Sequence, residues 1–501
     1  MLHRTLPFYY TDSYKLGHAD QYPADTEAVY SNFTARSEKL LPIPEQYKDG
    51  KYVVMGVSAF MEKMREVWVA RLLNMSEHEF EHKLSEFIAE MGAFVGPNGL
   101  KPERFQALYR YVRAHEELPL RFRSVPDGTV LNIRTPCLTV ENTEPEFYWF
   151  VNYMESYVST ELWKPMTTAT IARFYRRVLE DYATRTGSPQ EFVDWQAHDF
   201  SMRGMSGAID GAFSGLGHLA YFTGTDNLLS MKLAKEVYYS GNEYLYGGSV
   251  PATEHSVMCM GGEDSELETF RRLVTQYNSG VVSIVSDTWD YFNVITNTAT
   301  ELKDVILNRQ PDAYGLAKVV FRPDSGNPID IICGDPEAPE GSNERKGSLQ
   351  CLWEVFGGTV TETGHKLLNQ RVGLIYGDSI TPQRMLDILA RMDAEGWASA
   401  NIVFGVGSFT YQYLTRDSLG FAMKATWGRR AGAEVFLFKD PKTDSGTKKS
   451  ARGRVVVVDG YLCDGLTEAD EQAIPNNQLT AETGGEPLEL IRARLRAELQ
   501  G

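Results

Sequence analysis

The sequence predicts an α/β protein built around a closed or nearly closed β/α barrel, with an additional α+β region. Two observations lead to this class. After residue 190, short apolar runs alternate with amphipathic helical stretches, which is the chain order of a parallel sheet. Polar or glycine residues follow nearly every one of those runs, and α/β barrels carry their active sites at the C-terminal ends of their strands.

The composition is that of a folded protein without a nucleic-acid or membrane role. Of the 501 residues, 43% are hydrophobic and 23% are charged, and the formal net charge of −17 disfavours a surface that grips nucleic acid or anionic lipid. No stretch approaches the roughly 18 apolar residues of a membrane span, and the N-terminus lacks the apolar core of a signal peptide. The five scattered cysteines have no CxxC spacing, so we expect a cytoplasmic protein.

Residues 50–165 predict the α+β region. Tyr52–Arg71 and Ser76–Met91 have apolar residues at helical spacing. Thr129–Val140 alternates like a strand and ends at the turn-forming run Glu141–Pro145.

Seven apolar runs beyond residue 190 end in a polar or glycine-rich cluster. A doubly wound sheet would gather its ligand residues at one or two switch points, so seven such ends favour a barrel. The clusters are His198–Phe200, Gly224–Asp226, Glu254–Ser256, Ser286-Asp287, Arg322–Asp324, Gly377-Asp378 and Gly405–Gly407. The predicted helices are Asn227–Tyr238, Asp264–Tyr277, Gly347–Phe356 and Thr381–Gly396, with Leu488–Leu499 as a closing helix.

Two segments interrupt this order and are expected to be exposed loops. Pro336–Lys346 is rich in Pro, Glu and Gly, and Asp440–Arg454 is basic. The cations of the second segment are interpreted as a solvated face: Lys442, Lys448, Lys449, Arg452 and Arg454.

Three strand ends have residue types suited to a sugar phosphate. Arg322–Pro328 combines a forked cation, a carboxylate for ribose hydroxyls and a flexible glycine, although a Pro-Asp-Ser-Gly run alone is more often a plain turn. Gly377-Asp378 and Gly405–Ser408 offer backbone N–H groups to a phosphate, although glycines after strands are often only turns.

His255 lies between Glu254 and Ser256, and taken alone such a histidine is more often a buried, satisfied side chain than a functional one. No HExxH or paired-histidine motif is present, which disfavours zinc hydrolase chemistry.

Six segments, read in order, resemble the signature motifs of the nicotinamide phosphoribosyltransferase family. They are Thr11–Lys15, His198–Phe200 with Arg203-Gly204, Gly224–Asp226, Ser249–Ser256, Arg322–Pro328 and Leu414–Asp417. Glu141–Glu146 and Val435–Pro441 are similar outside the catalytic motifs, so the resemblance extends over most of the chain.

The resemblance implies a pentosyltransferase that moves the 5-phosphoribosyl group of phosphoribosyl pyrophosphate to nicotinamide, giving nicotinamide mononucleotide and pyrophosphate in NAD salvage. It implies the irregular β/α barrel of the type II phosphoribosyltransferases over residues 186–408, and an α+β domain of residues 1–185 completed by 409–501. It also implies a homodimer with active sites shared across the interface, Mg²⁺ as cofactor and ATP as co-substrate. It identifies no metal ligands.

For the nicotinamide site, the resemblance implies that the pyridine ring stacks between Phe200 and Tyr14 of the partner subunit. Arg203 would bond the amide oxygen, and Asp226 would accept from the amide nitrogen. Nicotinate would bring a second carboxylate against Asp226 and be repelled. The other substrate contacts expected here are Asp12 and Ser249.

For the phosphates, the resemblance implies that Arg322 and Asp324 hold the ribose and its phosphate. The remaining sugar and 5-phosphate contacts would be Gly377, Asp378, Gly407 and Ser408. The pyrophosphate and nucleotide-phosphate contacts would be Arg416, Lys424 and Lys439, with Lys15 and Arg36 from the other chain. A highly charged leaving group needs such cations.

The implied reaction is a displacement at the ribose C1 carbon through an oxocarbenium-like transition state, without a protein nucleophile on the sugar. His255 resembles the family's autophosphorylated histidine, and Asp287 matches the carboxylate that orients it.

Two alternatives remain beside this interpretation. A nicotinate phosphoribosyltransferase shares the barrel but binds an acid, which Asp226 disfavours. A binding protein with a degenerate site would lack Arg322, Asp324 or His255, and all three are present. Three residues depart from the family pattern, which leaves the affinity for phosphate open: Ser408 in place of a glycine, Ala422 in place of a serine and Met202 in place of an aromatic residue.

Overall fold

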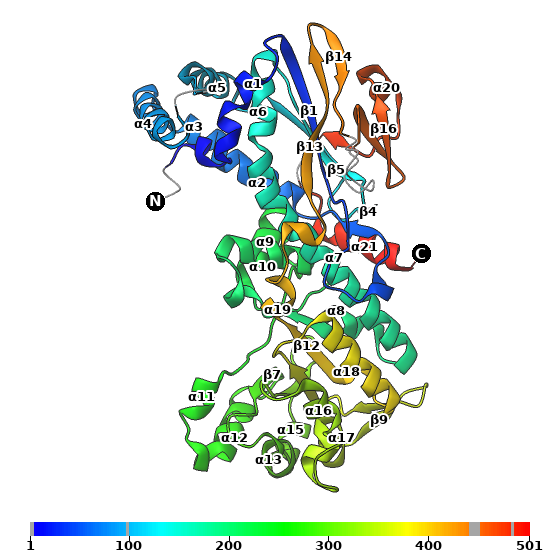
Figure 1. The fold of residues 1–501 in the computed structure, drawn as a ribbon. Coiled ribbons are helices and arrows are strands. Elements are labelled where there is room, and N and C mark those ends of the chain that lie inside the picture. Colours follow the sequence, from blue (N-terminus) through cyan, green and yellow to red (C-terminus); the bar gives the residue numbers. More distant parts are fainter. Residues whose placement is uncertain (1–4, 97–99, 440–450, 482–484, 501) are drawn as a thin grey trace.

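The chain folds into two lobes that are stacked one above the other (Figure 1). The computed structural model describes residues 5–96, 100–439, 451–481 and 485–500. The upper lobe, called the sheet lobe below, holds a six-stranded antiparallel sheet, and the lower lobe, called the barrel lobe, holds the parallel strands. Helices α7 (Glu155–Thr186) and α21 (Leu488–Gln500) lie where the lobes meet.

Both ends of the chain build the six-stranded sheet, whose order is β14-β13-β1-β5-β3-β17. Strand β5 is buried along its whole length and β1 over most of it, because both lie inside the sheet. The strands are β1 (Thr26–Thr34), β3 (Leu120–Ser124), β5 (Pro136–Asn142), β13 (Ala422–Arg430), β14 (Ala433–Phe436) and β17 (Thr480–Ala481).

Helices from the first 153 residues pack an aromatic core in the sheet lobe. Phe8 lies 4.7 Å from Phe105 and 6.3 Å from Trp68, measured between ring centroids. Helix α4 starts where the Ser76 hydroxyl accepts from the backbone N–H of Glu79. The helices are α1 (His18–Gln21), α2 (Val57–Met64), α3 (Arg71–Leu73), α4 (Glu77–Val95), α5 (Pro102–His115) and α6 (Tyr148–Tyr153).

Helix α7 joins the two lobes and is crossed closely by α9 (Ala208–Leu219). A Cβ atom on Gly217 of α9 would lie 2.5 Å from the carbonyl oxygen of Pro165 in α7. The crossing therefore requires glycine at this position.

The barrel lobe has five regular parallel strands in the order β6-β12-β11-β8-β7. Short extended segments continue the ring between β6 and β7. Thr225 donates to Gly248 O at 2.9 Å, and Ser283 of β7 donates to Pro251 O at 2.9 Å. The strands are β6 (Ala197–Asp199), β7 (Gly280–Val285), β8 (Ala317–Arg322), β11 (Val372–Tyr376) and β12 (Ile402–Val406).

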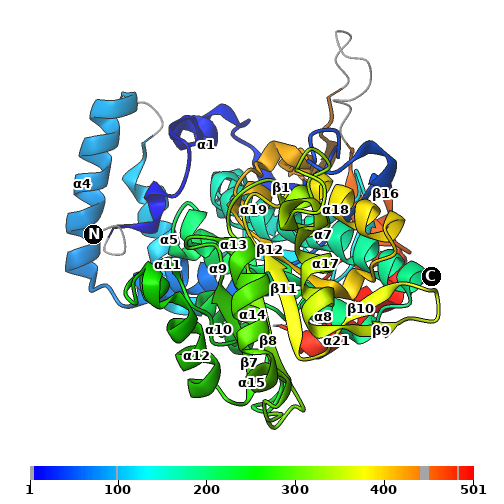
Figure 2. The same ribbon diagram turned by 90° about the horizontal axis from the view of Figure 1, so that it is seen from below.

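The predicted irregular β/α barrel is thus confirmed, and two of the seven predicted strands are irregular segments, around residues 223–226 and 248–253. Helices surround the strands, as Figure 2 shows from below. They include α10 (Leu228–Val237), α11 (His255–Cys259), α12 (Glu266–Gln276), α13 (Tyr291–Asn293), α14 (Ala299–Glu301), α15 (Lys303–Leu307), α16 (Pro328–Cys333), α17 (Asn343–Phe356), α18 (Pro382–Ala394) and α19 (Ser408–Tyr411).

The helices predicted in this region agree with α10, α12, α17 and α18, and the closing helix agrees with α21. At α18 the predicted cap is present, because the Thr381 hydroxyl accepts from Arg384 N. Helix α17 has a kink at Gly347 (φ 74°), the residue where the predicted helix begins.

Two predictions for the sheet lobe need correction. Thr129–Val140 is not one strand: β4 (Val130–Asn132) pairs with β2 (Lys51–Val53), whereas β5 joins the large sheet. Arg134 has a φ of 76° between them, which turns the chain out of the extended conformation. Likewise, Tyr52–Arg71 begins as β2 and becomes helical only after Gly56 (φ 91°).

The predicted basic loop also needs correction at its end. Residues 440–450 lie outside the described part of the chain, but Arg454 opens strand β15 (Arg454–Val458) and is 2% exposed. Its guanidinium pairs with Glu141 at 2.8 Å and with Glu471. The positive charge is therefore paired inside the fold and does not belong to a solvated face.

The smaller elements cover the two lobes. Two hairpins, β9–β10 and β15–β16, and the short helix α20 complete the fold. Their remaining bounds are β9 (Gly358–Val360), β10 (Lys366–Leu368), β16 (Tyr461–Leu466) and α20 (Glu468–Ala473).

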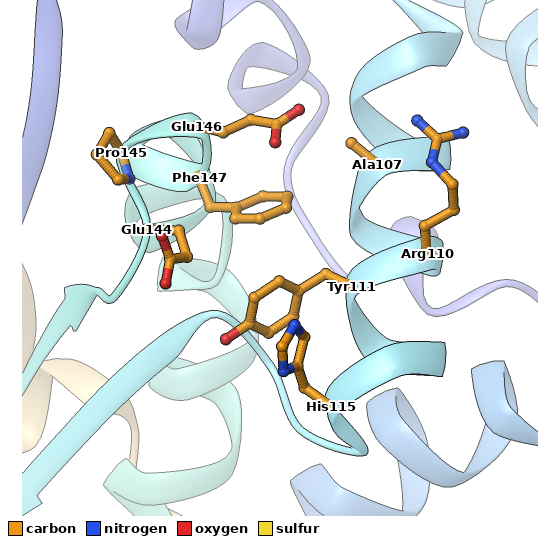
Figure 3. Close-up of a pocket in the computed structure, with 8 residues that line it drawn as sticks. All are labelled: Ala107, Arg110, Tyr111, His115, Glu144, Pro145, Glu146 and Phe147. Carbon is orange, nitrogen blue, oxygen red and sulfur yellow. The ribbon is translucent and has the colours of Figure 1, made fainter.

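A pocket of about 520 Å³ opens on the sheet lobe between α5 and the turn before α6 (Figure 3). Its floor includes the rings of Tyr111 and Phe147, 5.3 Å apart between centroids, and Glu144 and Glu146 of the Glu141–Glu146 segment lie on one wall. It contains none of the predicted site residues.

Candidate active site

Phe200 lies directly over the C-terminal ends of β11 and β12. Its backbone N–H donates to Val406 O at 2.9 Å. A Cβ atom on Gly405 would lie 2.4 Å from the Phe200 ring, and one on Gly377 would lie 3.0 Å from it. Both positions therefore make room for the ring, a role that we had not assigned to either glycine. The Arg322 guanidinium carbon lies 5.9 Å from the ring centroid.

Asp226 accepts from two donors, one of them His198, whose ring centroid lies 5.0 Å from that of Phe200. His198 Nε2 donates to Asp226 Oδ1 at 3.0 Å, and Ser249 Oγ donates to the same oxygen at 2.5 Å. Partial burial raises the pKa of the Asp226 carboxyl, but these hydrogen bonds and the charges of His198 and Arg322 outweigh it and hold the pKa below its usual value. Asp226 is thus a half-exposed, ionised acceptor.

His218 of α9 holds the Gly224–Asp226 strand end by a hydrogen bond, a role that the sequence does not indicate. Its buried ring donates from Nε2 to Gly224 O at 2.9 Å and accepts at Nδ1 from the Tyr411 hydroxyl at 2.7 Å. Burial lowers the pKa of His218 to about 4. A neutral histidine therefore connects the Gly224–Asp226 strand end to α19.

His255 and Asp287 form the predicted pair. His255 Nε2 lies 3.2 Å from Asp287 Oδ1; the histidine side chain is 47% exposed and the carboxylate only 5%. The second oxygen of Asp287 accepts from Asp324 N at 2.8 Å and from Ser325 Oγ at 2.6 Å. Asp287 thus orients the imidazole and also fixes the loop that follows β8.

Arg322 and Asp324 lie side by side at the end of β8, with Nη2 and Oδ2 3.7 Å apart. Arg322 Nε is buried without a hydrogen-bond partner among the described residues. The Tyr376 hydroxyl donates to the carbonyls of Ser325 and Gly326 at 3.0 and 2.9 Å. Tyr376 therefore holds this loop in place, and its sequence position inside an apolar run gave no sign of it.

The last strand ends carry the predicted phosphate loop. Gly407 precedes α19 and accepts from Thr410 N at 3.1 Å. Ser408 fits because a Cβ on the facing Gly204 would lie only 2.5 Å from the Ser408 Cβ. Gly211 likewise leaves room for Met202, because a Cβ on this glycine would clash with the Met202 sulfur. Asp378 is exposed next to Ser379, whose hydroxyl donates to it at 3.2 Å.

A chain of contacts connects residues at these strand ends. Contacts run from Phe200 to Arg322, from Arg322 to Asp324, from Asp324 to Asp287 and on to His255. We call this set the strand-end group: Phe200, Asp226, Ser249, His255, Asp287, Arg322, Asp324, Gly377, Asp378, Gly407 and Ser408. Arg203 lies three residues after Phe200 in the sequence, in an exposed turn at residues 202–204.

The remaining predicted residues form a second group on the sheet lobe. Lys15 pairs with Glu155, and Lys424 Nζ lies 3.7 Å from the same carboxylate. Tyr14 is 59% exposed with Lys15 Nζ 5.0 Å from its ring centroid. We call this set the sheet-lobe group: Asp12, Tyr14, Lys15, Arg36, Arg416 and Lys424.

The other members of the sheet-lobe group have contacts of the same local kind. Arg36 Nε donates to Gly420 O at 2.8 Å, Asp12 accepts from Ser156 Oγ at 2.5 Å, and Arg416 is half-exposed beside Asp417. Lys439 is exposed at the edge of the described residues. In one chain, these contacts stay within the group and its neighbours and do not reach the strand-end group.

Two features are absent from the described residues. They contain no cluster of three or more His, Cys, Asp or Glu side chains that could hold a metal ion. No helix among them combines the length and the apolar character that crossing a membrane requires. All five cysteines are free thiols.

The fold is similar to that of a solved enzyme. The nicotinate-nucleotide pyrophosphorylase from Pyrococcus furiosus matches 98% of this chain and 95% of its own, with a TM-score of 0.51 and 14% identity. At that identity the likeness concerns the fold alone.

Sequence comparisons assign the family. Residues 195–480 match the model of the nicotinate phosphoribosyltransferase (NAPRTase) family. The nicotinamide phosphoribosyltransferase of Acinetobacter baylyi is 48% identical over 100% of this chain and 99% of its own length. That of Mycoplasma pneumoniae is 35% identical over 88% of this chain and 94% of its own.

The family match and the named relatives define a phosphoribosyltransferase, an enzyme of the pentosyltransferase class, and the barrel is a fold that carries its active site at the strand ends. Within that class, this chain belongs to the nicotinate phosphoribosyltransferase family.

Proposed function

We propose that this enzyme is a nicotinamide phosphoribosyltransferase. It transfers the 5-phosphoribosyl group of phosphoribosyl pyrophosphate to nicotinamide and releases nicotinamide mononucleotide and pyrophosphate, a step of NAD salvage. The names of its relatives from Acinetobacter baylyi and Mycoplasma pneumoniae support this activity.

The observation that carries the substrate choice is the ionised carboxylate of Asp226, which is bonded to His198, the neighbour of the Phe200 ring. A carboxylate accepts the N–H of a neutral amide, whereas nicotinate would bring a second negative charge against it. Nicotinate phosphoribosyltransferase is therefore the second candidate, and Asp226 counts against it.

Binding and positioning account for the chemistry. The pyridine ring stacks on Phe200, while Arg203 takes the amide oxygen and Asp226 with Ser249 the amide nitrogen. Arg322 and Asp324 hold the ribose and its phosphate, with Gly377, Asp378, Gly407 and Ser408 around them. The pyridine nitrogen is already a free base, so it displaces pyrophosphate at C1 without a protein nucleophile, and catalysis rests on alignment and charge stabilisation.

His255 is the residue that couples ATP to this reaction. Asp287 engages Nε2 of the ring, so Nδ1 is the nitrogen left to attack the γ-phosphorus of ATP, and ADP leaves. The ring is half-exposed, as access by a nucleotide requires. A phosphorylated His255 would then add negative charge beside Asp287, which bonds the loop of Asp324, and so change the grip on phosphoribosyl pyrophosphate.

Magnesium is the cofactor that this substrate chemistry requires. Mg²⁺ in such sites is usually bound by one or two carboxylates together with substrate phosphates. Asp324 and Asp378 are the carboxylates proposed for that role, because they follow β8 and β11, which are neighbouring parallel strands. The ion would neutralise the leaving pyrophosphate.

The active enzyme is a homodimer in which the sheet-lobe group of one subunit completes the strand-end group of the other. Tyr14 then supplies the second face of the ring stack, and Lys15, Arg36, Arg416 and Lys424 supply cations for the pyrophosphate. Lys15 and Lys424 share Glu155 within one chain, so the same subunit provides both, which differs from the expectation from the sequence that only Lys15 and Arg36 come from the other chain. Lys439 is proposed as a further phosphate contact. The five free thiols fit work in the reducing cytosol.

The test uses purified protein with phosphoribosyl pyrophosphate and Mg²⁺, offered nicotinamide or nicotinate, with and without ATP. We expect nicotinamide mononucleotide as the main product and a higher yield with ATP. Preferred turnover of nicotinate would replace the proposal by the second candidate.

A further inference from the structure

Arg492 of helix α21 is buried behind the two segments that carry Asp226 and Ser249. It is 5% exposed, and all five of its N–H donors are used. No carboxylate forms an ion pair with it among the described residues, so backbone carbonyls and one hydroxyl compensate its charge.

The acceptors belong to two stretches of chain. On the first, Arg492 donates to Leu219 O at 2.8 Å and to Phe222 O at 3.1 Å. On the second, it donates to Leu245 O at 3.1 Å, Tyr246 O at 2.8 Å and the Tyr244 hydroxyl at 3.2 Å. One guanidinium therefore fixes the separation of residues 219–222 and 244–246.

Both stretches run directly into the candidate site. Asp226 lies four residues after Phe222, and Ser249 lies three residues after Tyr246. Between these points the two segments bond to each other, since Gly248 N donates to Thr223 O at 2.9 Å and Thr225 N to Gly248 O at 2.9 Å. They end where Ser249 Oγ donates to Asp226.

These segments are the irregular part of the barrel ring. The five regular strands are held by continuous ladders, whereas residues 223–226 and 248–253 have only isolated bridges to their neighbours. A segment with few ladder bonds depends on side chains for its position. Arg492 supplies five bonds to the residues that precede the two segments.

We propose that Arg492 is a positioning residue for nicotinamide, which sets the distance between Asp226 and Ser249 and so the affinity for the amide group. The inference rests on the proposed function. It assigns to the C-terminal helix, which lies between the lobes (Figure 1), a part in substrate choice.

The test compares Arg492→Gln and Arg492→Lys with Arg494→Gln. Arg494 lies on the same helix but bonds Glu486 and the Asp127 carbonyl of the sheet lobe, so it is a matched control. Lysine keeps the positive charge but has three N–H donors where arginine has five. We therefore expect Arg492→Lys to keep only part of the wild-type affinity for nicotinamide.

Arg492→Gln should raise the KM for nicotinamide by at least about fivefold and leave the KM for phosphoribosyl pyrophosphate within about twofold. The reason is that Arg492 positions Asp226 and Ser249, which bind the amide and not the phosphates. Amide hydrogen exchange in residues 220–226 and 244–249 should become faster, and neither change should occur in Arg494→Gln.

An unchanged nicotinamide KM with unchanged exchange would overturn the proposal, as would an equal rise in both KM values. If Arg492→Gln does not fold, Arg492→Lys is measured in the same way and decides by the same criteria. Absence of nicotinamide turnover by the wild-type protein would refute the proposed function instead, and the exchange measurement would still decide whether Arg492 positions the two segments.

Discussion

At Asp226, His198 and Ser249 donate to a carboxylate whose pKa is held below its usual value, and under the proposed function this carboxylate accepts from the amide of nicotinamide. Asp226→Ala removes both the acceptor for the amide and the charge that repels an acid. We expect the ratio of kcat/KM for nicotinamide over nicotinate to fall by about tenfold or more, the scale of a hydrogen bond to a charged group. Steady-state kinetics with both substrates measure this ratio.

The control for this substitution is Asp25→Ala. Asp25 pairs with Arg430 on the surface of the sheet lobe, far along the fold from the strand ends. It should keep the wild-type ratio. An unchanged ratio in Asp226→Ala would refute the role assigned to that carboxylate.

Gly405 gives a second prediction at the scale of single atoms. A methyl group here would lie 2.4 Å from the Phe200 ring, so Gly405→Ala must displace the aromatic platform. We expect a higher KM for nicotinamide and a loss of about 1–3 kcal/mol in stability, as for other overpacked sites.

Kinetics and thermal unfolding check both effects. Gly92→Ala is the matched control, because a Cβ at Gly92 in α4 would have no neighbour within 4 Å. A wild-type KM in Gly405→Ala would mean that the ring position does not govern nicotinamide binding.

Between elements, His218 connects α9, the Gly224–Asp226 strand end and α19 as a neutral ring, and it yields a prediction about pH. Its folded-state pKa of about 4 lies below the ordinary value of 6.5, so the unfolded chain binds a proton that the folded protein does not. This contribution to stability is complete above pH 6.5 and is lost as the pH falls towards 4.

His218→Gln keeps a donor for the Gly224 carbonyl but does not titrate. From pH 7 to pH 5, the wild-type protein should lose about 2 kcal/mol more stability than the variant, because the other titrating groups are common to both. Thermal unfolding at the two pH values measures the difference. Parallel losses in the two proteins would show that folding does not lower the pKa of His218.

The elements also show which features a sequence can reveal. Strand ends such as Gly224–Asp226 and Arg322–Asp324 were identifiable because polar residues directly follow apolar runs, and a parallel barrel brings such ends together. Helix α18 was identifiable from its Thr-Pro start.

Features that depend on contacts across the fold were not identifiable. Tyr376 and His218 lie in apolar surroundings, and only the folded chain brings their polar atoms to loop carbonyls. Arg454 was assigned to an exposed loop because its basic neighbours dominated the pattern, whereas Glu141 and Glu471, its partners, are distant in sequence or on another element. Local patterns report faces and ends of elements, and the pairing of buried charges is set by tertiary packing.

For the whole molecule, the separation of the predicted residues into two groups is the main structural reason for expecting a dimer. The strand-end group and the sheet-lobe group each gather residues from distant parts of the sequence, yet among the described residues no hydrogen bond or ion pair joins one group to the other. A two-fold dimer brings one group of each subunit to the other group of its partner in an isologous arrangement.

Subunit complementation tests this arrangement. Tyr14→Ala disables the sheet-lobe group and Asp324→Ala disables the strand-end group, so each homodimer should have little activity. In a mixed dimer, one site combines the intact Asp324 of the first subunit with the intact Tyr14 of the second. With random assembly, half of the dimers are mixed and half of their sites are intact, so co-expression should restore about a quarter of wild-type activity.

The matched mixture of Asp324→Ala with Phe200→Ala, both in the strand-end group, leaves no intact site and should restore none. Equal activity of the two mixtures would exclude a shared site and would assign Tyr14 a role within its own chain.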